Sequence, residues 1–214
     1  MGVRERLVDY HQRTVHASRV RRVAQAMGEH AGAAETLLDI GAGTGEIGAL
    51  VARAAGAREV RGVDIQVRTG AQIPVEPYDG VRLPFPDDRF AVALLSDVLH
   101  HCPSPRAVLV EALRVAPKLV IKEHFAFGPL SHAALLALDL AGNFGPGVRV
   151  EGHYFTIPSW VALVTAAGGR MTRLTWPLRV HELPASLITS PSWQFVATIE
   201  RQQPSQGNHH EQRT

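Results

Sequence analysis

One stretch of the sequence, residues 37–48, constrains the fold more than any other. A short apolar run there ends in Asp39 and Ile40, and a helix-compatible run begins at Glu46. Between them three glycines stand at alternate positions: Gly41, Gly43 and Gly45. Glycine adopts dihedrals that a Cβ atom forbids and lets a ligand lie against the backbone, and the first N–H groups of a helix lack partners within the helix. The stretch therefore predicts a strand, a tight nucleotide-binding turn and a helix.

Two classes of nucleotide-binding protein use such a turn. Residues 43–48 satisfy the G-x-G-x-x-G pattern of dinucleotide sites, and Asp64 follows at the distance of about 20 residues that these sites require. In dinucleotide sites, however, the first glycine of the pattern ends the strand, whereas here Gly41 holds that place and Asp39 precedes it. This D-x-G-x-G-x-G register resembles the first motif of class I S-adenosylmethionine-dependent methyltransferases. A glycine-rich turn without a ligand is the third alternative.

A second run, residues 79–101, separates these alternatives. Residues 79–90 read DGVRLPFPDDRF and residues 91–101 read AVALLSDVLHH. The run closely resembles a stretch of small-molecule methyltransferases of the same class, and no dehydrogenase pattern predicts it. Further on, KEH at 122–124 and LDLAGN at 138–143 look like a bacterial subgroup of that family whose substrates are largely unassigned. One departure is Ala91, where the family usually has aspartate.

Length and composition limit the kinds of protein that this chain can be. With 214 residues, 45% of them hydrophobic, the chain can bury one sizeable core, so a single domain is expected. The net charge is only +2 and no basic tail occurs, so nucleic acid is not an expected partner. The charged start and the lack of an apolar stretch of about 18 residues predict a cytoplasmic protein without membrane contact. The single Cys102 excludes an internal disulfide and a cysteine-based zinc site.

The resemblance implies an α/β fold: a Rossmann-like, doubly wound sheet of about seven strands, mostly parallel with the last strand antiparallel, with helices on both faces. The apolar patterns predict strands at 36–40, 59–64, 91–95, 119–124, 170–176 and 193–200. Helices are predicted within 3–27 and at 46–55, 105–115, 130–141 and 157–167. Ser104 and Thr156 are the expected N-caps of two of these helices. Glycine and prolines between residues 65 and 77 exclude a full helix there.

We expect residues 1–200 to form one methyltransferase domain. Residues 3–30 are predicted to form a helical cap near the cofactor, where Tyr10, His11 and His16 either line the pocket or face solvent. Residues 125–158 form an insertion after a strand and are predicted to build the acceptor pocket. Its expected apolar lining is Phe125, Phe127, Leu135 and Phe144. The polar residues 201–214 are predicted to be a disordered tail.

The resemblance implies S-adenosylmethionine as cofactor and S-adenosylhomocysteine as product. Asp64 ends a strand at the carboxyl edge of the sheet, where it either accepts hydrogen bonds from ribose hydroxyls or caps the next segment of the chain. Asp79 matches the family acid that accepts from the adenine amino group, and Ser96 and Asp97 match positions beside the methionyl end. The predicted cofactor-binding residues are Asp39, Gly41, Gly43, Gly45, Asp64, Ile65, Asp79, Gly80, Ser96 and Asp97.

Methyl transfer from an activated donor mainly requires that the acceptor be positioned, and a hydroxyl acceptor also loses a proton. Histidine is the natural base near neutral pH. His100, His101 and His124 all follow strands at the carboxyl edge. We predict His101 as the catalytic base and His124 as the second candidate; a purely structural or binding role for all three stays open. No metal site is expected, because adjacent histidines do not easily converge on one ion and no further ligand cluster is visible.

The sequence therefore predicts an S-adenosylmethionine-dependent methyltransferase. Its acceptor is expected to be a flat or cyclic small molecule, methylated on oxygen or nitrogen in secondary metabolism. The expected assembly is a monomer or homodimer. The alternative is a cofactor-binding protein of the same fold that performs non-methylating chemistry, such as a cyclase, or serves as a binding module.

Overall fold

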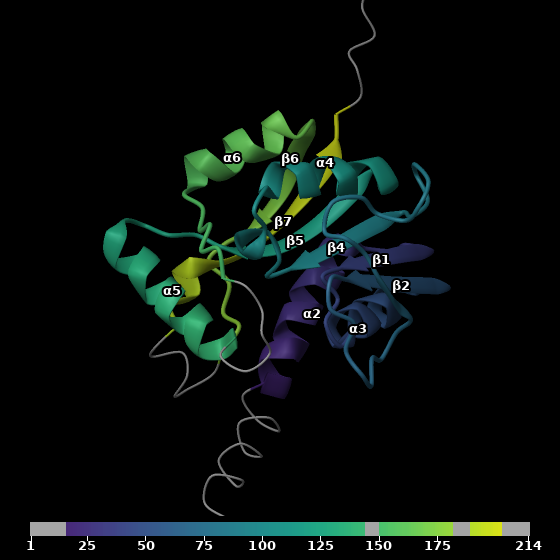
Figure 1. The fold of residues 1–214 in the computed structure, drawn as a ribbon, viewed down its shortest axis with the longest axis horizontal. Helices are drawn as coiled ribbons and strands as arrows, with labels where there is room; N and C mark the ends of the chain where they lie inside the picture. Colours follow the sequence, from purple (N-terminus) through teal and green to yellow (C-terminus); the bar gives the residue numbers. More distant parts are fainter. Residues whose placement is uncertain (1–15, 144–149, 182–188, 203–214) are drawn as a thin grey trace, which may run out of the picture.

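A seven-stranded sheet forms the centre of the protein (Figure 1). The computed structural model describes residues 16–143, 150–181 and 189–202. The strands lie in the order β3-β2-β1-β4-β5-β7-β6. Their bounds are Thr36–Ile40 for β1, Glu59–Asp64 for β2, Val75–Pro77 for β3, Val92–Ser96 for β4, Lys118–His124 for β5, Gly169–Thr175 for β6 and Gln194–Arg201 for β7.

The pairing of the strands confirms the predicted sheet. Strands β1 to β5 pair in parallel, whereas β7 inserts between β5 and β6 and runs antiparallel to both. The sequence did not predict the edge strand β3, which pairs Val75 with Gly62 of β2. Pro74 precedes it and Pro77 is its last residue, and three residues are too few to show an alternating pattern. Arg201 still belongs to β7, and the rest of the predicted tail, from residue 203 on, lies outside the described residues.

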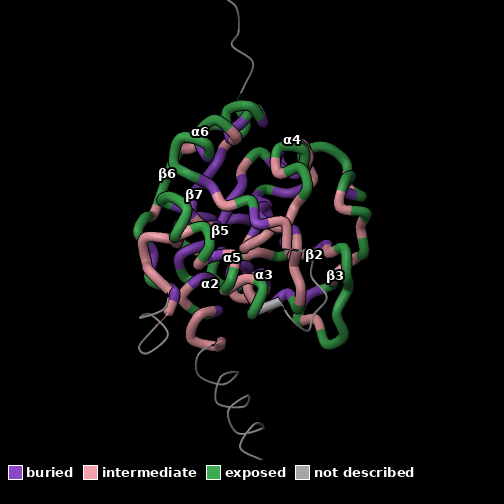
Figure 2. The backbone as a smooth tube through the Cα atoms, turned by 60° about the vertical axis from the view of Figure 1, so that its left-hand side comes forward, coloured by how far each residue is buried: buried purple, intermediate pink, exposed green. Residues whose placement is uncertain are grey.

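Helices cover both faces of the sheet (Figure 1). The helices are α2 (Ala17–Ala31), α3 (Glu46–Ala55), α4 (Pro105–Val115), α5 (Pro129–Asn143) and α6 (Ile157–Ala166). Side chains of a strand point alternately to opposite faces, so Leu37 packs with α2 and α3 whereas Leu38 packs with α4 and α6. Figure 2 shows the buried residues gathered in the central strands. No helix in the described ranges is long and apolar enough to cross a bilayer.

The ends of two helices test the predicted caps. Thr156 caps α6 through a capping box: its hydroxyl accepts from the Ser159 N–H, and the Ser159 side chain accepts from the Thr156 N–H. Ser104 holds the N-cap position of α4, but its side chain makes no capping hydrogen bond. Pro105 at the first helical position fits there because it lacks the N–H that would stay unpaired.

A buried histidine fixes helix α2 against the two antiparallel strands. His30 is 3% exposed, and its two ring nitrogens each lie 2.8 Å from a threonine hydroxyl, Thr198 of β7 and Thr175 of β6. Burial is the main cause that lowers the pKa of His30 from 6.5 to about 4. The neutral ring thus holds α2, whose first turn reaches the cavity at the carboxyl edge of the sheet.

We predict that acid weakens the fold through His30. Between pH 6.5 and pH 4 the unfolded chain binds a proton that the folded His30 does not, so stability falls as pH falls. From pH 7 to pH 5 the loss is about 2 kcal/mol. Urea unfolding at both pH values should show this loss in the wild type and less of it in His30→Gln. An equal loss in both proteins would contradict the assignment.

Candidate functional site

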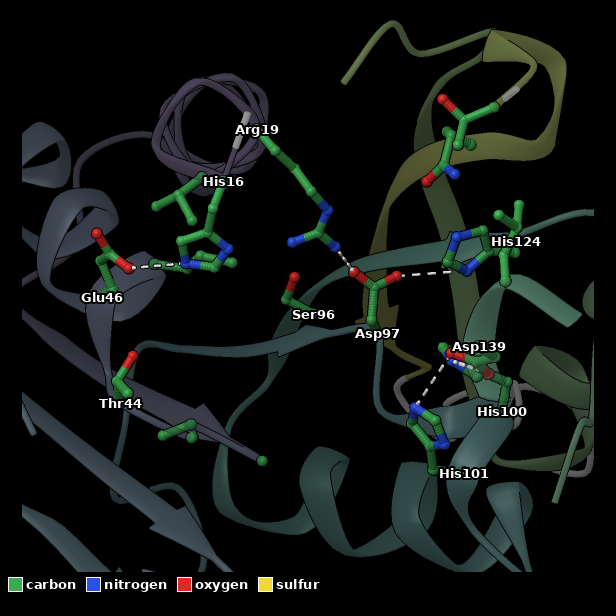
Figure 3. Close-up of a pocket in the computed structure, with 18 of the residues that line it drawn as sticks. His16, Arg19, Thr44, Glu46, Ser96, Asp97, His100, His101, His124 and Asp139 are labelled. Carbon is green, nitrogen blue, oxygen red and sulfur yellow. Dashed lines mark hydrogen bonds and ion pairs between the residues drawn. The ribbon is translucent and has the colours of Figure 1, made fainter. Parts of the chain in front are cut away.

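A cavity of about 510 Å³ lies at the carboxyl ends of β1, β4 and β5. The glycine turn after β1 forms one side, and histidines after β4 and β5 form the other (Figure 3). The structure brings these predicted residues into its lining: Asp39, Gly41, Gly43, Ser96, Asp97, His101 and His124. His16 also lines the cavity and lies 3.4 Å from Glu46, whereas Tyr10 and His11 fall outside the described residues.

The turn between β1 and α3 requires glycine for two reasons. Gly41, Gly43 and Gly45 have φ angles of 72°, 57° and 69°, which side-chain-bearing residues rarely adopt. A Cβ atom on Gly41 would lie 2.6 Å from Val98 Cγ2, and one on Gly45 would lie 2.5 Å from Ile73 Cγ1. Gly45 is the N-cap of α3, so the turn leads directly into the start of a helix.

Asp39 lies beneath this turn. Its side chain is 3% exposed, and burial raises its pKa to about 7, with the charge of Asp64 adding to the rise. A Cβ atom on Gly48 would lie 2.5 Å from Asp39 Oδ2, so helix α3 can approach the carboxyl only with glycine there. The Asp39 carboxyl and the missing side chain at Gly48 therefore fit together: one occupies the space that the other leaves open.

Four of the predicted cofactor residues lie beside the turn, outside the cavity lining. Asp64 accepts hydrogen bonds from the Gly43 N–H at 2.7 Å and the Gln66 N–H at 2.9 Å. Asp79 Oδ1 accepts from two backbone N–H groups, and these bonds lower the pKa of this exposed carboxyl. Ile65 is 70% exposed, and Gly80, with φ of 78°, approaches it. The four form a rim on the β2 side of the turn.

A buried ion network follows β4. Asp97 adopts a left-handed φ of 58° and accepts hydrogen bonds from Arg19 of α2 and from Lys122 of β5. Burial alone would raise the pKa of Asp97, but Lys122 and Arg19 outweigh it and hold that pKa well below its usual range. Lys122 is fully buried, which lowers its pKa. In Figure 3 Arg19 reaches from its helix onto Asp97, so α2 is tied to the site.

A second buried network surrounds His100. Its Nδ1 lies 2.7 Å from Glu123 Oε2, and its Nε2 lies 3.3 Å from Asp139 Oδ2. Burial opposes a charge on this ring, but Glu123 and Asp139 outweigh it and raise the pKa of His100 to about 10. The Tyr154 hydroxyl donates to Asp139 Oδ2 at 2.7 Å. The two carboxylates therefore favour the protonated form of His100.

The two predicted catalytic histidines differ in their surroundings. His101 Nε2 lies 3.8 Å from Asp139 Oδ1, and its Nδ1 is buried without a hydrogen-bond partner. Burial and the His100 charge lower the pKa of His101. Both nitrogens of His124 face charged groups, Nδ1 at 3.3 Å from Asp97 and Nε2 at 3.4 Å from Lys122. Burial and Lys122 lower its pKa as well. Among the described residues, Nδ1 of both rings is therefore buried without a hydrogen-bond partner, but Nδ1 of His124 lies against the Asp97 carboxylate.

The prediction of an apolar lining is wrong. Phe125 is fully buried and stacks on Phe195 with ring centroids 3.9 Å apart, so it belongs to the core. Phe127 is 49% exposed and packs on Trp176, and Phe144 lies outside the described residues. Of the three described residues of this set, only Leu135 lines the cavity. The strand register sends Phe125 into the core, which a run of aromatic residues in the sequence does not reveal.

Several residues that build the site were not among the predicted site residues: Arg19, Lys122, Glu123, Asp139 and Tyr154. Three of them stand in the KEH and LDLAGN patterns that carried the family resemblance, so a signal was present. Arg19 and Tyr154 stand in no such pattern. Their places depend on how α2 and the segment after α5 pack, which the local sequence does not specify.

Comparison with known families identifies the chain. A family model described as a methyltransferase domain matches residues 9–174. The chain belongs to this family. The match confirms the predicted S-adenosylmethionine-dependent methyltransferase and decides against the dinucleotide alternative for the glycine turn. No curated protein sequence matches the chain at a significant level.

Solved structures share the fold of this methyltransferase. A methyltransferase of Haloferax volcanii, solved with the Trm112 methyltransferase activator, has a TM-score of 0.66 at 12% identity, covering 93% of this chain and 95% of that one. The 1,6-didemethyltoxoflavin-N1-methyltransferase of Burkholderia thailandensis, solved with S-adenosylhomocysteine, has a TM-score of 0.62 at 19% identity. The match covers 94% of this chain and 88% of that one. The cyclase SpnF has a TM-score of 0.60 at 17% identity, and the match covers 84% of this chain and 80% of that one. At these identities the likeness confirms the Rossmann-like fold alone.

We predict that Lys122→Met destabilises the methyltransferase by about 3 kcal/mol, because it leaves the largely buried Asp97 carboxylate, 17% exposed, short of one counter-charge. The double variant Lys122→Met/Asp97→Asn should recover part of this loss, since no uncompensated charge then remains. Chemical unfolding of the two single variants and the double variant measures the coupling. Additive losses in the double variant would show that the pair is not coupled.

Proposed function

We propose that this methyltransferase transfers the methyl group of S-adenosylmethionine to the oxygen or nitrogen of a small polar molecule. One observation carries the proposal: a single cavity joins the glycine turn to a wall of histidine and carboxylate side chains. The donor and the acceptor would meet where these two sides face each other. A cavity of about 510 Å³ suits a small molecule better than a peptide or nucleic acid.

The cofactor is proposed to lie along the turn, with its methionyl end at Ser96 and Asp97. Ser96 Oγ is buried without a hydrogen-bond partner in the described chain, so it is available to a ligand. Asp64 is proposed to accept from the ribose hydroxyls, because its carboxylate has lone pairs beyond the two used by backbone N–H groups. The adenine is proposed to lie on the rim formed by Ile65, Asp79 and Gly80.

The acceptor is proposed to lie at the opposite wall, which residues 125–158 help to build through Asp139 and Tyr154. We place His101 at the acceptor's reacting group, since it keeps a ring nitrogen that no other described side chain uses. His124 is proposed to act as a positioning residue that helps to hold Asp97. Because histidine and carboxylate side chains form this wall, an acceptor with several hydrogen-bonding groups fits it best.

We predict that S-adenosylhomocysteine binds with micromolar affinity and that Asp64→Ala weakens it about 10-fold, since hydrogen bonds to a charged acceptor are lost. Isothermal titration calorimetry measures both values. Glu35→Ala is the control, because it removes an equal charge from an exposed site far from the turn. Binding of NAD instead, or equal affinity in Asp64→Ala and the wild type, would contradict the proposed cofactor site.

We predict that His101→Ala lowers the rate of methyl transfer about 100-fold while S-adenosylhomocysteine still binds normally. The rate is measured as conversion of S-adenosylmethionine to S-adenosylhomocysteine with a fractionated extract that supplies the acceptor. His132→Ala is the matched control, because this exposed histidine stands on α5 and does not line the cavity. A wild-type rate in His101→Ala would remove this residue from the mechanism.

The same assay separates methyl transfer from the alternative function. The fold likeness to the cyclase SpnF is compatible with a protein that binds the cofactor without consuming it. Tight binding of S-adenosylmethionine with no turnover in any extract fraction would favour that alternative.

A further inference from the structure

The turn after β4 brings two adjacent histidines onto one carboxylate. Leu99–His101 forms a 3-10 turn, which places the rings of His100 and His101 with centroids 4.1 Å apart and interplanar angle 44°. Nε2 of His100 and Nε2 of His101 lie 3.3 Å and 3.8 Å from the two oxygens of Asp139 on α5. Figure 3 shows the three side chains pointing toward one another. The two adjacent histidines therefore approach one carboxylate, and Asp139 is a candidate for the further ligand that the sequence pattern does not reveal.

We propose that His100, His101 and Asp139 form a binding site for one divalent transition-metal ion. One ligand atom from each of the three lies within 4.8 Å of the others. When two ligand atoms each lie about 2.1 Å from the same ion, they are about 3.0 Å apart in octahedral geometry and about 3.4 Å apart in tetrahedral geometry. The His100–Asp139 distance of 3.3 Å lies between these values. The His101–Asp139 distance of 3.8 Å exceeds both, so these two side chains would move closer together on binding an ion.

The partners of these side chains are those that a metal site requires. The other ring nitrogen of His100, Nδ1, lies 2.7 Å from the carboxylate of Glu123, which is fully buried. Glu123 is held in turn by the Leu99 N–H at 2.7 Å. Metal-binding histidines usually donate their second N–H to a carboxylate in this way, which fixes the ring. Tyr154 similarly fixes the Asp139 carboxylate.

The ligand types indicate which ions fit. Two imidazoles and one carboxylate suit Zn²⁺ or Fe²⁺ rather than Mg²⁺ or Ca²⁺, which prefer oxygen ligands. All three residues line the cavity, so coordination positions remain open toward the acceptor. This role of the ion rests on the proposed function: the ion would bind the acceptor's hydroxyl oxygen and lower the pKa of the hydroxyl. The proton would pass to water, and the oxygen would bond to the methyl carbon as the carbon–sulfur bond breaks and S-adenosylhomocysteine leaves. His101 Nε2 would then be a ligand, and the ion rather than the ring would promote loss of the proton.

A neighbouring cluster is the weaker candidate. Asp97, His100, Glu123 and His124 also offer ligand atoms within 4.8 Å of one another. However, Lys122 and Arg19 already bind the carboxylate of Asp97, so a cation there would meet two positive charges. The Asp139 side of His100 is farther from those two cations and opens to the cavity.

Metal binding can be measured without knowing the acceptor. His209 and His210 near the C-terminus could bind metals on their own, so every protein carries alanine at both positions. Zn²⁺ is titrated calorimetrically and Co²⁺ by its visible absorption, in this background and in three further variants. These are His101→Ala, Asp139→Asn and the control His132→Ala, which removes an exposed histidine from the same helix as Asp139. Glu123→Gln is added to test the carboxylate behind His100.

We expect one ion per chain in the background protein and in His132→Ala. Affinity should fall at least about 100-fold in His101→Ala and Asp139→Asn, and about 10-fold or more in Glu123→Gln. No stoichiometric binding in the background protein, or affinity in His101→Ala and Asp139→Asn equal to that of the background, would overturn the metal site. S-adenosylhomocysteine binding is measured on the same samples. If the cofactor binds and the metal does not, only the metal site fails, and the proposed function stands.

Discussion

The site depends on one buried carboxylate, that of Glu123. It accepts the Leu99 N–H and contacts the ring of His100, so it ties the end of β5 to the turn after β4. The His100 charge and hydrogen bond outweigh burial and hold the pKa of Glu123 well below its usual range. A carboxylate in the core is stable only when its charge and lone pairs are matched, as they are here. Glu123 thus holds the ring of His100, and this ring in turn lies against Asp139 and His101.

Most of the fold could be predicted from the sequence because its strands bear strong local patterns. The β-branched and leucine-rich runs of β1, β4 and β5 are buried on both faces, which gives continuous apolar segments that are easy to recognise. Strand β3 was not predicted because three residues, the last of them Pro77, carry no pattern, and its pairing with Gly62 depends on tertiary contact. The boundary at Arg201 was missed for a similar reason, since a polar residue there still pairs with Gly169 of β6.

The cofactor side of the site was more predictable than the acceptor side. The turn at Gly41, Gly43 and Gly45 depends on local dihedrals, and these select glycine directly in the sequence. The acceptor side instead depends on long-range charge pairing, such as His100 with Asp139 and Asp97 with Arg19, and no local pattern encodes such pairs. The predicted apolar lining failed because Phe125, directly after β5, turns inward to the core. The network of charged groups lines the cavity instead.

The two walls of the cavity also differ in how freely they can change. The glycine turn directly follows strand β1 and is closely packed. A Cβ atom added to two of its glycines or to Gly48 would clash with Val98, Ile73 or the Asp39 carboxyl. Helix α5 stands apart from the sheet, and much of its surface is exposed (Figure 1). Mutations along α5 can therefore reshape the acceptor wall while the core and the cofactor wall keep their packing. A library confined to residues 129–141 that spares the buried Leu135 and the site residue Asp139 would sample new acceptors at little risk to folding.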